Sequence, residues 1–255
     1  MGFTISGFII GMLVGLTGVG GGSLMTPLLV IIFKINPAIA IGTDLLYAAI
    51  TKSAGILSHG KMGHIDWNVV KKLMLGSIPA SLITTYFLKE IDLTSPITLH
   101  WIEVGLGIAL LLTAMAVFLQ PRIIKKVAEK KIKHASNTKI LTILLGLILG
   151  CVVTLTSVGA GALGVTALLL LYPGMRTKRI IGTDIAHAVP LTLFAGLGHY
   201  NLGNVDLMLL SALLIGSIPG IWLGSYLSAK IDENKLRYIL VIILLLVGVE
   251  LILNN

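Results

Sequence analysis

Eight long apolar stretches, separated by short polar loops, constrain the fold of this chain more than any other feature. A transmembrane helix needs about 20 apolar residues, and each stretch is near that length or longer. Only 12% of the 255 residues are charged, whereas a soluble domain carries about 25%. We therefore predict an all-α, multi-pass protein of the cell membrane, with apolar segments at 3–33, 38–58, 69–88, 101–120, 139–172, 179–199, 206–229 and 236–253.

The two halves of the sequence resemble each other. Residues 42–80 align without a gap with residues 182–220, and both copies contain Gly-Thr-Asp and Gly-Ser-Ile-Pro. Upstream, after a shift of one residue, 7–24 overlays 146–163. Internal repeats define the architecture of a chain before any other signal. We predict two four-segment repeats, at 1–120 and 139–255, joined by a basic cytoplasmic linker at 121–138.

The Lys and Arg residues indicate how the segments cross the membrane. If all eight cross once and the linker is cytoplasmic, ten basic residues lie inside and eight outside, a poor match to the positive-inside rule. If 3–33 and 139–172 enter the membrane and return as broken hairpins, the count becomes sixteen inside against two outside. The halves would then face opposite ways, as in many secondary transporters. The alternative is four plain spans per half in parallel orientation.

Both long segments are interrupted near their centres by glycine. At about 1.5 Å per residue, each exceeds one perpendicular crossing of a core about 30 Å thick. The interruptions are Thr17-Gly-Val-Gly-Gly-Gly-Ser23 and Thr156-Ser-Val-Gly-Ala-Gly-Ala162. Glycine allows the backbone torsions that a break needs, and Pro27 fits the first turn of a restarting helix. Because broken backbone is tolerated only where it lines a cavity or is buried in protein, we expect a polar cavity near the membrane midplane.

The N-terminus of a restarted half-helix offers free N–H groups and a partial positive charge, which suit a small anion. The residues that we expect to bind such a substrate lie in the two breaks and in the repeated Gly-Thr-Asp, with one lysine in mid-segment. They are Thr17, Gly20, Gly21, Gly22, Ser23, Thr43, Lys52, Thr156, Gly159, Gly161 and Thr183. The alternative role for the glycines is close helix packing.

Four ionisable residues inside the spans have two interpretations each. A buried Lys52 ammonium is costly without an anion, but its long side chain could also reach the headgroups. Asp44 and Asp184 are candidates for coupling a proton or ion, or for capping helices. His187, one turn after Asp184, could titrate near neutral pH beside it or simply pack.

Several function classes are disfavoured. We find no nucleophile and base pair and no His-Glu-x-x-His motif, so we expect no enzyme, no metal site and no cofactor. The net charge of +8 is concentrated in loops, which indicates orientation rather than nucleic-acid binding. The lone Cys151 allows no intrachain disulfide.

The paired motifs resemble the sulfite exporter TauE/SafE family of membrane permeases. The resemblance rests on Gly-Leu-Thr-Gly-Val-Gly-Gly-Gly-Ser followed by Pro, then Ala-x-Gly-Thr-Asp, His-Gly-x-x-Gly-x-Ile-Asp and Gly-Ser-Ile-Pro. It implies a secondary transporter of sulfite, sulfonates or related small anions. The elements carried over are Gly18, Gly20, Gly21, Gly22, Pro27, Gly42, Thr43, Asp44 and their second-half partners. The second copy departs at Ser157, Ala160 and Thr166, which replace Gly18, Gly21 and Pro27.

From these features we expect a permease that moves a small anion by alternating access at a midplane site between the repeats. Its partners would be the anion, the lipid bilayer, a coupling H⁺ or Na⁺ and a second copy in a homodimer. The alternatives are a membrane scaffold or assembly factor that transports nothing, and a carrier of cations or neutral solutes. Carboxylates in the cavity would favour the cation carrier.

Overall fold

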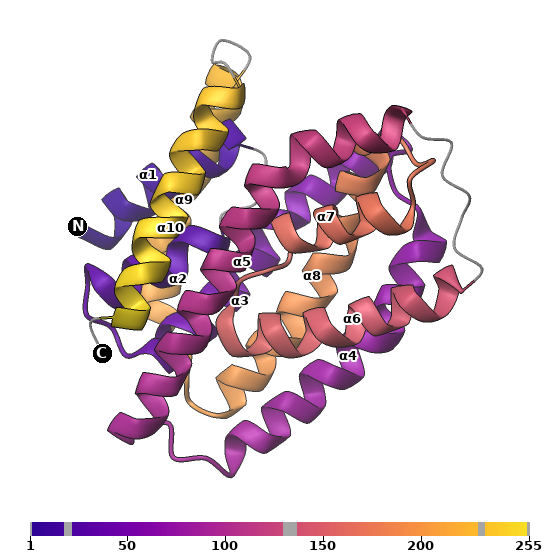
Figure 1. Ribbon diagram of the computed structural model, residues 1–255. Coiled ribbons are helices and arrows are strands. Elements are labelled where there is room, and N and C mark those ends of the chain that lie inside the picture. The colour runs from indigo at the N-terminus through magenta and orange to yellow at the C-terminus, as the bar shows by residue number, and fades with distance from the viewer. Residues whose placement is uncertain (1, 18–21, 130–136, 229–232, 254–255) are drawn as a thin grey trace.

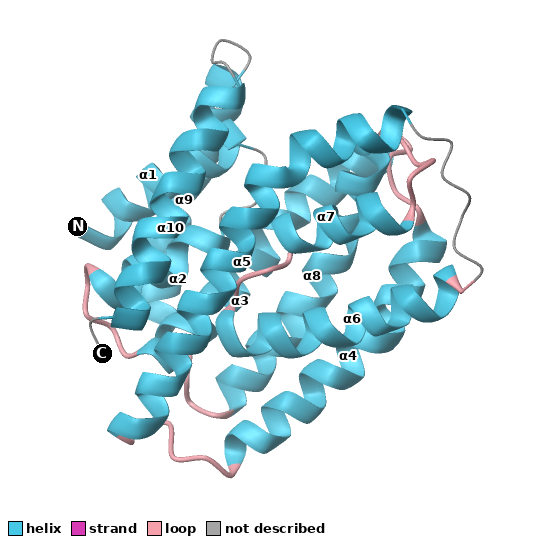
Figure 2. Cartoon of the chain, in the orientation of Figure 1, coloured by secondary structure: helices cyan, strands magenta, loops and turns pink. Residues whose placement is uncertain are grey.

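A computed structural model describes residues 2–17, 22–129, 137–228 and 233–253, which are helical apart from short loops (Figures 1 and 2). The described residues form ten helices. They are α1 (Gly2–Thr17), α2 (Gly22–Ile31), α3 (Pro37–Lys61), α4 (Trp67–Lys89), α5 (Pro96–Glu129), α6 (Thr138–Thr156), α7 (Ala162–Leu171), α8 (Thr177–Asn201), α9 (Leu207–Ser228) and α10 (Glu233–Leu253). The prediction of an all-α protein is confirmed. The helix ends lie close to the ends of the predicted apolar segments except in α5, which continues past residue 120 to Glu129, within the predicted linker.

Local sequence explains where these helices begin. Asn36 Oδ1 accepts a hydrogen bond of 2.9 Å from the Ala38 N–H at the start of α3, and Pro37 occupies the first helical position, where its missing N–H costs nothing. Asp66 caps α4 by accepting from the N–H groups of Asn68 and Val69 at 3.2 Å each. Polar residues in the loops thus fix the ends of apolar helices.

The two longest predicted segments fold back on themselves. The hydroxyls of Thr142, near the start of α6, and Tyr172, just after α7, lie 2.7 Å apart. In the first half, the rings of Phe3 and Phe33 have centroids 4.8 Å apart. A straight helix of about thirty residues would hold such ends about 45 Å apart. Each segment is therefore a hairpin of two helices, and Figure 1 shows α6 and α7 running in opposite directions.

Each hairpin packs on a helix of the other half. α1 lies along α9, and α6 lies along α4. Glycines make both contacts close, because a Cβ at Gly7, Gly11 or Gly15 would collide with the α9 backbone, and one at Gly146 or Gly150 with the α4 backbone. Small residues that let helix backbones approach are typical of membrane proteins. The glycines on the faces of α1 and α6 thus allow close helix packing.

Two further contacts join equivalent helices of the two halves. α3 packs on α8 and α5 packs on α10 (Figure 1), around buried clusters that include Leu45, Val153 and Leu191. Large apolar side chains such as Leu75, Trp222 and Leu246 remain exposed on the outside, as expected for a surface that faces lipid. Within the described residues, five helices are long and apolar enough to cross a membrane: α5, α6, α8, α9 and α10.

Candidate functional site

The break in the second hairpin lies where the sequence predicts it, between the end of α6 at Thr156 and the start of α7 at Ala162. Ser157 ends α6 in the left-handed conformation with φ 58°, and Gly159 and Gly161 have φ values of 117° and 131°. The two glycines adopt torsions that side-chain-bearing residues rarely adopt. The Thr156 hydroxyl accepts from the Val158 N–H at 3.2 Å and donates to the Val152 carbonyl at 2.7 Å. The break is therefore an ordered turn.

Asp44 connects this break to the first half of the chain. Its Oδ2 accepts hydrogen bonds from Thr26 Oγ1 of α2 at 2.6 Å and from Ser157 Oγ at 2.9 Å. The Asp44 side chain is fully buried. Because Asp44 stands seven residues into α3 and Asn36 caps that helix, the helix-cap interpretation does not apply to Asp44. This carboxylate instead holds together one helix from each hairpin.

Lys52 reaches the same break from α3. Its Nζ donates a hydrogen bond of 2.7 Å to the carbonyl oxygen of Ala160. The ammonium also interacts electrostatically with the carboxylates of Asp184 and Asp44. Lys52 is half-buried and points into the protein, so the snorkelling interpretation does not describe its position here.

Asp184 occupies the position in α8 that Asp44 occupies in α3. It is 1% exposed, and among the described residues neither of its carboxylate oxygens has a hydrogen-bond partner. Its Oδ1 lies against Gly164, in the first turn of α7, where a Cβ would collide with it. His187 does not pair with Asp184, since its Nε2 lies 2.8 Å from the hydroxyl of Ser77 on α4.

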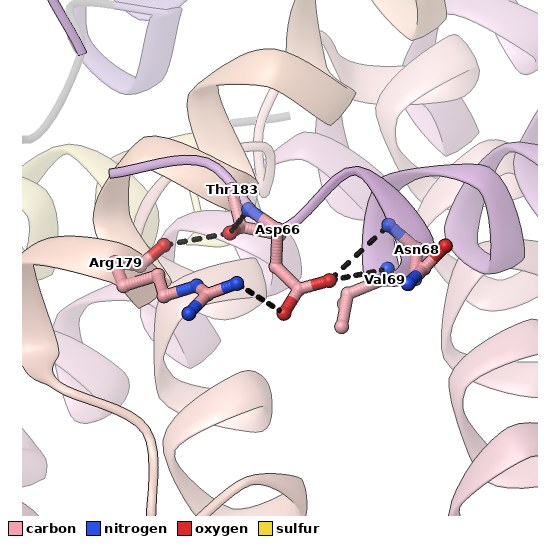
Figure 3. A network of polar contacts seen from close by, with 5 residues as sticks. All are labelled: Asp66, Asn68, Val69, Arg179 and Thr183. Atoms are coloured by element: carbon pink, nitrogen blue, oxygen red, sulfur yellow. Dashed lines mark hydrogen bonds and ion pairs between the residues drawn. The ribbon is translucent and has the colours of Figure 1, made fainter. Parts of the chain in front are cut away.

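The two threonines of Gly-Thr-Asp clamp loops of the opposite half, and Figure 3 shows the clamp at Thr183. Thr183 Oγ1 accepts from the Asp66 N–H at 2.9 Å and donates to the Arg179 carbonyl at 2.6 Å. Arg179 Nη2 also pairs with Asp66 Oδ2 at 3.0 Å. Thr43 Oγ1 accepts from the Asp206 N–H at 3.1 Å. Both hydroxyls are thus engaged with backbone, away from the cluster formed by Lys52, Asp44 and Asp184.

The first break falls largely outside the described residues. Gly20 and Gly21 lie outside them, and so do the side-chain surroundings of Thr17, Gly22 and Ser23. α2 begins at Gly22, so Pro27 is the sixth residue of its helix. The expectation that Pro27 lies in the first turn is therefore wrong. Within α2 the proline removes one hydrogen bond in the second turn.

Comparisons with known proteins agree with this architecture. The sequence profile of the sulfite exporter TauE/SafE family matches residues 3–251. The chain belongs to this family. It is 40% identical to the probable membrane transporter protein YjnA of Bacillus subtilis (strain 168) over 250 residues, 97% of this chain and 98% of that protein. It is 28% identical to the probable membrane transporter protein MJ0441 of Methanocaldococcus jannaschii over 269 residues, 98% and 94% of the two chains. No solved structure matches significantly.

The protein is therefore a membrane transporter, with several apolar helices that make it a multi-pass protein of the cell membrane, and it is not an enzyme. In this TauE/SafE family member the ammonium of Lys52 and the carboxylates of Asp44 and Asp184 gather beside the break between α6 and α7. Such a cluster can bind an ion and can change its net charge. Both abilities are what a coupled transporter needs.

Sequence reasoning missed three partners in this cluster. Thr26 and Ser157 hold Asp44, and Ser77 holds His187. Ser157 was visible as a departure from Gly18 in the first copy, and a polar residue at a glycine position could have marked it. Thr26 and Ser77 carried no signal, because a lone hydroxyl in an apolar helix usually bonds its own backbone.

Proposed function

We propose that this transporter carries a small sulfur-containing oxyanion, such as sulfite or a sulfonate, across the cell membrane. The observation that supports this most is the hydrogen bond from Lys52 Nζ to the Ala160 carbonyl. It brings a cation to the interrupted backbone of α6 and α7, inside the protein. Asp44 and Asp184 offset the cost of burying this ammonium. An ammonium has three N–H donors, so two besides the one given to Ala160 can bind an anionic substrate. The family name points to sulfite.

The anion site that we propose combines Lys52 with the start of α7. The first N–H groups of a helix have no partner within that helix and carry a partial positive charge. The hydroxyl protons of Thr156 and Ser157 are donated to the Val152 carbonyl and to Asp44, so the donors for an anion are Lys52 and backbone N–H groups at the start of α7. The first-break residues, Thr17, Gly20, Gly21, Gly22 and Ser23, stay sequence-based candidates for binding the same anion. A tetrahedral or pyramidal oxyanion fits donors that converge from several directions.

Alternating access follows from the proposed topology. If each hairpin enters and leaves on one side and the other three long segments of each half cross once, each half crosses an odd number of times. The second half then faces the opposite way. Inverted repeats with broken helices at the midplane are a common plan of secondary transporters. The contacts of α1 with α9 and of α6 with α4 support this plan. α1 and α6 are equivalent helices of the two halves, and so are α9 and α4, so each contact is the counterpart of the other.

Thermal unfolding of the detergent-purified protein tests the substrate class. A ligand that binds only the folded state raises Tm by mass action. The panel comprises sulfite, thiosulfate, sulfoacetate, taurine, sulfate, simple carboxylates and Na⁺. We expect a selective rise with one sulfur oxyanion, lost in Lys52→Met and kept in the matched control Lys71→Met, whose exposed lysine lies near the start of α4.

Two other results would favour a different function. A rise with Na⁺ alone would favour a carrier of cations, for which Asp44 and Asp184 would supply the ligands. If no compound raises Tm and proteoliposomes take up none of the anions, the anion proposal fails, and the scaffold alternative would gain support.

A further inference from the structure

We infer that Asp184 binds the proton that this transporter carries together with its anion, while Asp44 does not. This inference rests on the anion transport proposed above and adds the coupling ion and its site. The two aspartates occupy equivalent positions in α3 and α8, yet their surroundings differ. Asp44 accepts two hydrogen bonds, from Thr26 and Ser157. Both oxygens of Asp184 are buried without a partner among the described residues.

The sequence explains this asymmetry. In the alignment of the two halves, the position of Ser157 is filled by Gly18, and the position of Thr26 is filled by Val165. Neither glycine nor valine has a hydroxyl, so both donors that hold Asp44 are missing from the equivalent positions. A buried carboxylate without donors is stabilised by binding a proton. The cluster therefore contains one carboxylate that is hydrogen-bonded and one that is open to a mobile proton.

Lys52 is the charged group that acts on Asp184. The helices packed against α8 near Asp184 are α3, α4, α6 and α7. Away from the ends of these helices their titratable side chains are Asp44, Tyr47, Lys52, Lys71, Lys72, Tyr86 and Cys151, and α8 itself adds His187 and His199. His187 and His199 are engaged by Ser77 and by the Thr154 carbonyl. Lys52 is thus the cation that interacts with the charge of Asp184.

The contact of Asp184 with Gly164 links the proton to the anion. With Asp44 and Asp184 both ionised beside Lys52, the three side chains carry a net formal charge of −1 and repel an anion at the start of α7. When Asp184 takes up a proton, this net charge becomes zero and the repulsion at the α7 N-terminus is removed. Proton and anion therefore bind together and leave together, which makes the protein a symporter of one proton with each anion.

Uptake into proteoliposomes tests this coupling. The probes are labelled thiosulfate and labelled methanesulfonate, which stay ionised over the working pH range. A gradient of about two pH units can drive about 100-fold accumulation by a one-to-one symporter. We expect gradient-driven accumulation by the unchanged protein and by the control Glu103→Gln, which removes a carboxylate on α5 that interacts with His100 and Lys34. In Asp184→Asn we expect exchange of labelled for unlabelled anion to remain measurable, but no accumulation in response to the gradient.

A second variant keeps the Asp184 carboxylate in place. Val165→Thr is isosteric and introduces the hydroxyl that Asp44 receives from Thr26. A donor favours the ionised carboxylate, so half-maximal transport should move to lower pH. The matched control is Val158→Thr, a buried valine in the break whose position in the first half is Val19.

The outcomes separate the two proposals. If Asp184→Asn still accumulates anion in response to the pH gradient, or if the unchanged protein transports the anion independently of pH, the inference is wrong while anion transport stands. If the unchanged protein moves neither probe and binds no anion of the thermal panel, the proposed function itself fails.

Discussion

The hydroxyls of Thr142 and Tyr172 lie 2.7 Å apart, although thirty residues of chain separate them. The corresponding pair in the first half, Phe3 and Phe33, stands 139 residues earlier and is also in contact. One pair shares a hydrogen bond, and the other brings two rings into tilted contact. The same position therefore closes both hairpins by different chemistry, which indicates that the fold-back itself is the property that both halves require.

Closure of the hairpins predicts a specific membrane topology. In a Cys151→Ser background, single cysteines replacing the exposed residues Lys71 and Lys178 should react with an impermeant thiol reagent from the same side. A cysteine at Lys89 should react from the other side. Reaction of positions 71 and 178 from opposite sides would show that 139–172 crosses the membrane. The labelling is measured in intact cells and in inverted vesicles.

Ser157 serves the fold through both its hydroxyl and its backbone, and two substitutions separate these roles. Ser157→Ala removes the hydrogen bond to Asp44 and should cost about 1.5–3 kcal/mol, the usual range for a bond to a charged group. Ser157→Gly removes the same bond but relieves the left-handed torsion, so it should cost about 1 kcal/mol less. Apparent Tm values in detergent compare the two. A lower Tm for the glycine variant would contradict this account.

Gly164 and Asp184 should be strongly coupled. Gly164→Ala places a methyl group where the Asp184 carboxylate lies, and overpacking of a buried site costs about 1–3 kcal/mol. In an Asp184→Ala background the carboxylate is absent, so the same substitution should be nearly neutral. Unfolding of the four proteins completes a double-mutant cycle, with an expected coupling energy of about 1–3 kcal/mol. Additive losses would mean that the two residues do not share this space.

The two threonine clamps should stabilise the protein to a similar degree. Thr183→Val and Thr43→Val each leave a loop N–H, of Asp66 or Asp206, without its acceptor, which should cost about 1 kcal/mol. Thr84→Val is the control, because the Thr84 hydroxyl bonds a carbonyl of its own helix. Tm should fall in the first two variants and stay unchanged in the third. An equal fall in all three would assign the effect to valine rather than to the clamps.

Helix boundaries and the position of the second break follow from the sequence alone. The length of the apolar segments, the polarity of the loops and the clusters of glycine are local properties of the sequence. They determine where helices begin and break because exposing unpaired backbone to lipid is costly. The sequence also identifies Lys52 as a lysine within an apolar segment, but not whether its side chain turns inward or reaches the headgroups.

The partners within the cluster depend on tertiary geometry. Ser157 meets Asp44 across 113 residues, and Lys52 meets Ala160 across 108. No periodicity encodes which carbonyl a lysine reaches or which aspartate a serine supports. The roles of Thr43 and Thr183 were hidden for the same reason, since a hydroxyl beside an aspartate looks the same in a binding site and in a loop clamp. The prediction that Pro27 lies in the first turn of its helix was wrong because proline is common both at helix starts and within membrane helices.

The glycine faces that join α1 to α9 and α6 to α4 bear on the origin of the chain. Each half presents a hairpin whose close-packing partner belongs to the other half, so neither half can bury its own glycine face. A gene encoding one repeat alone would yield a folded product only as a pair of copies, each lending its hairpin to the other. Fusion of two such genes would make this exchange permanent, and the two copies would then be free to diverge, one keeping the hydroxyls at its aspartate and the other losing them.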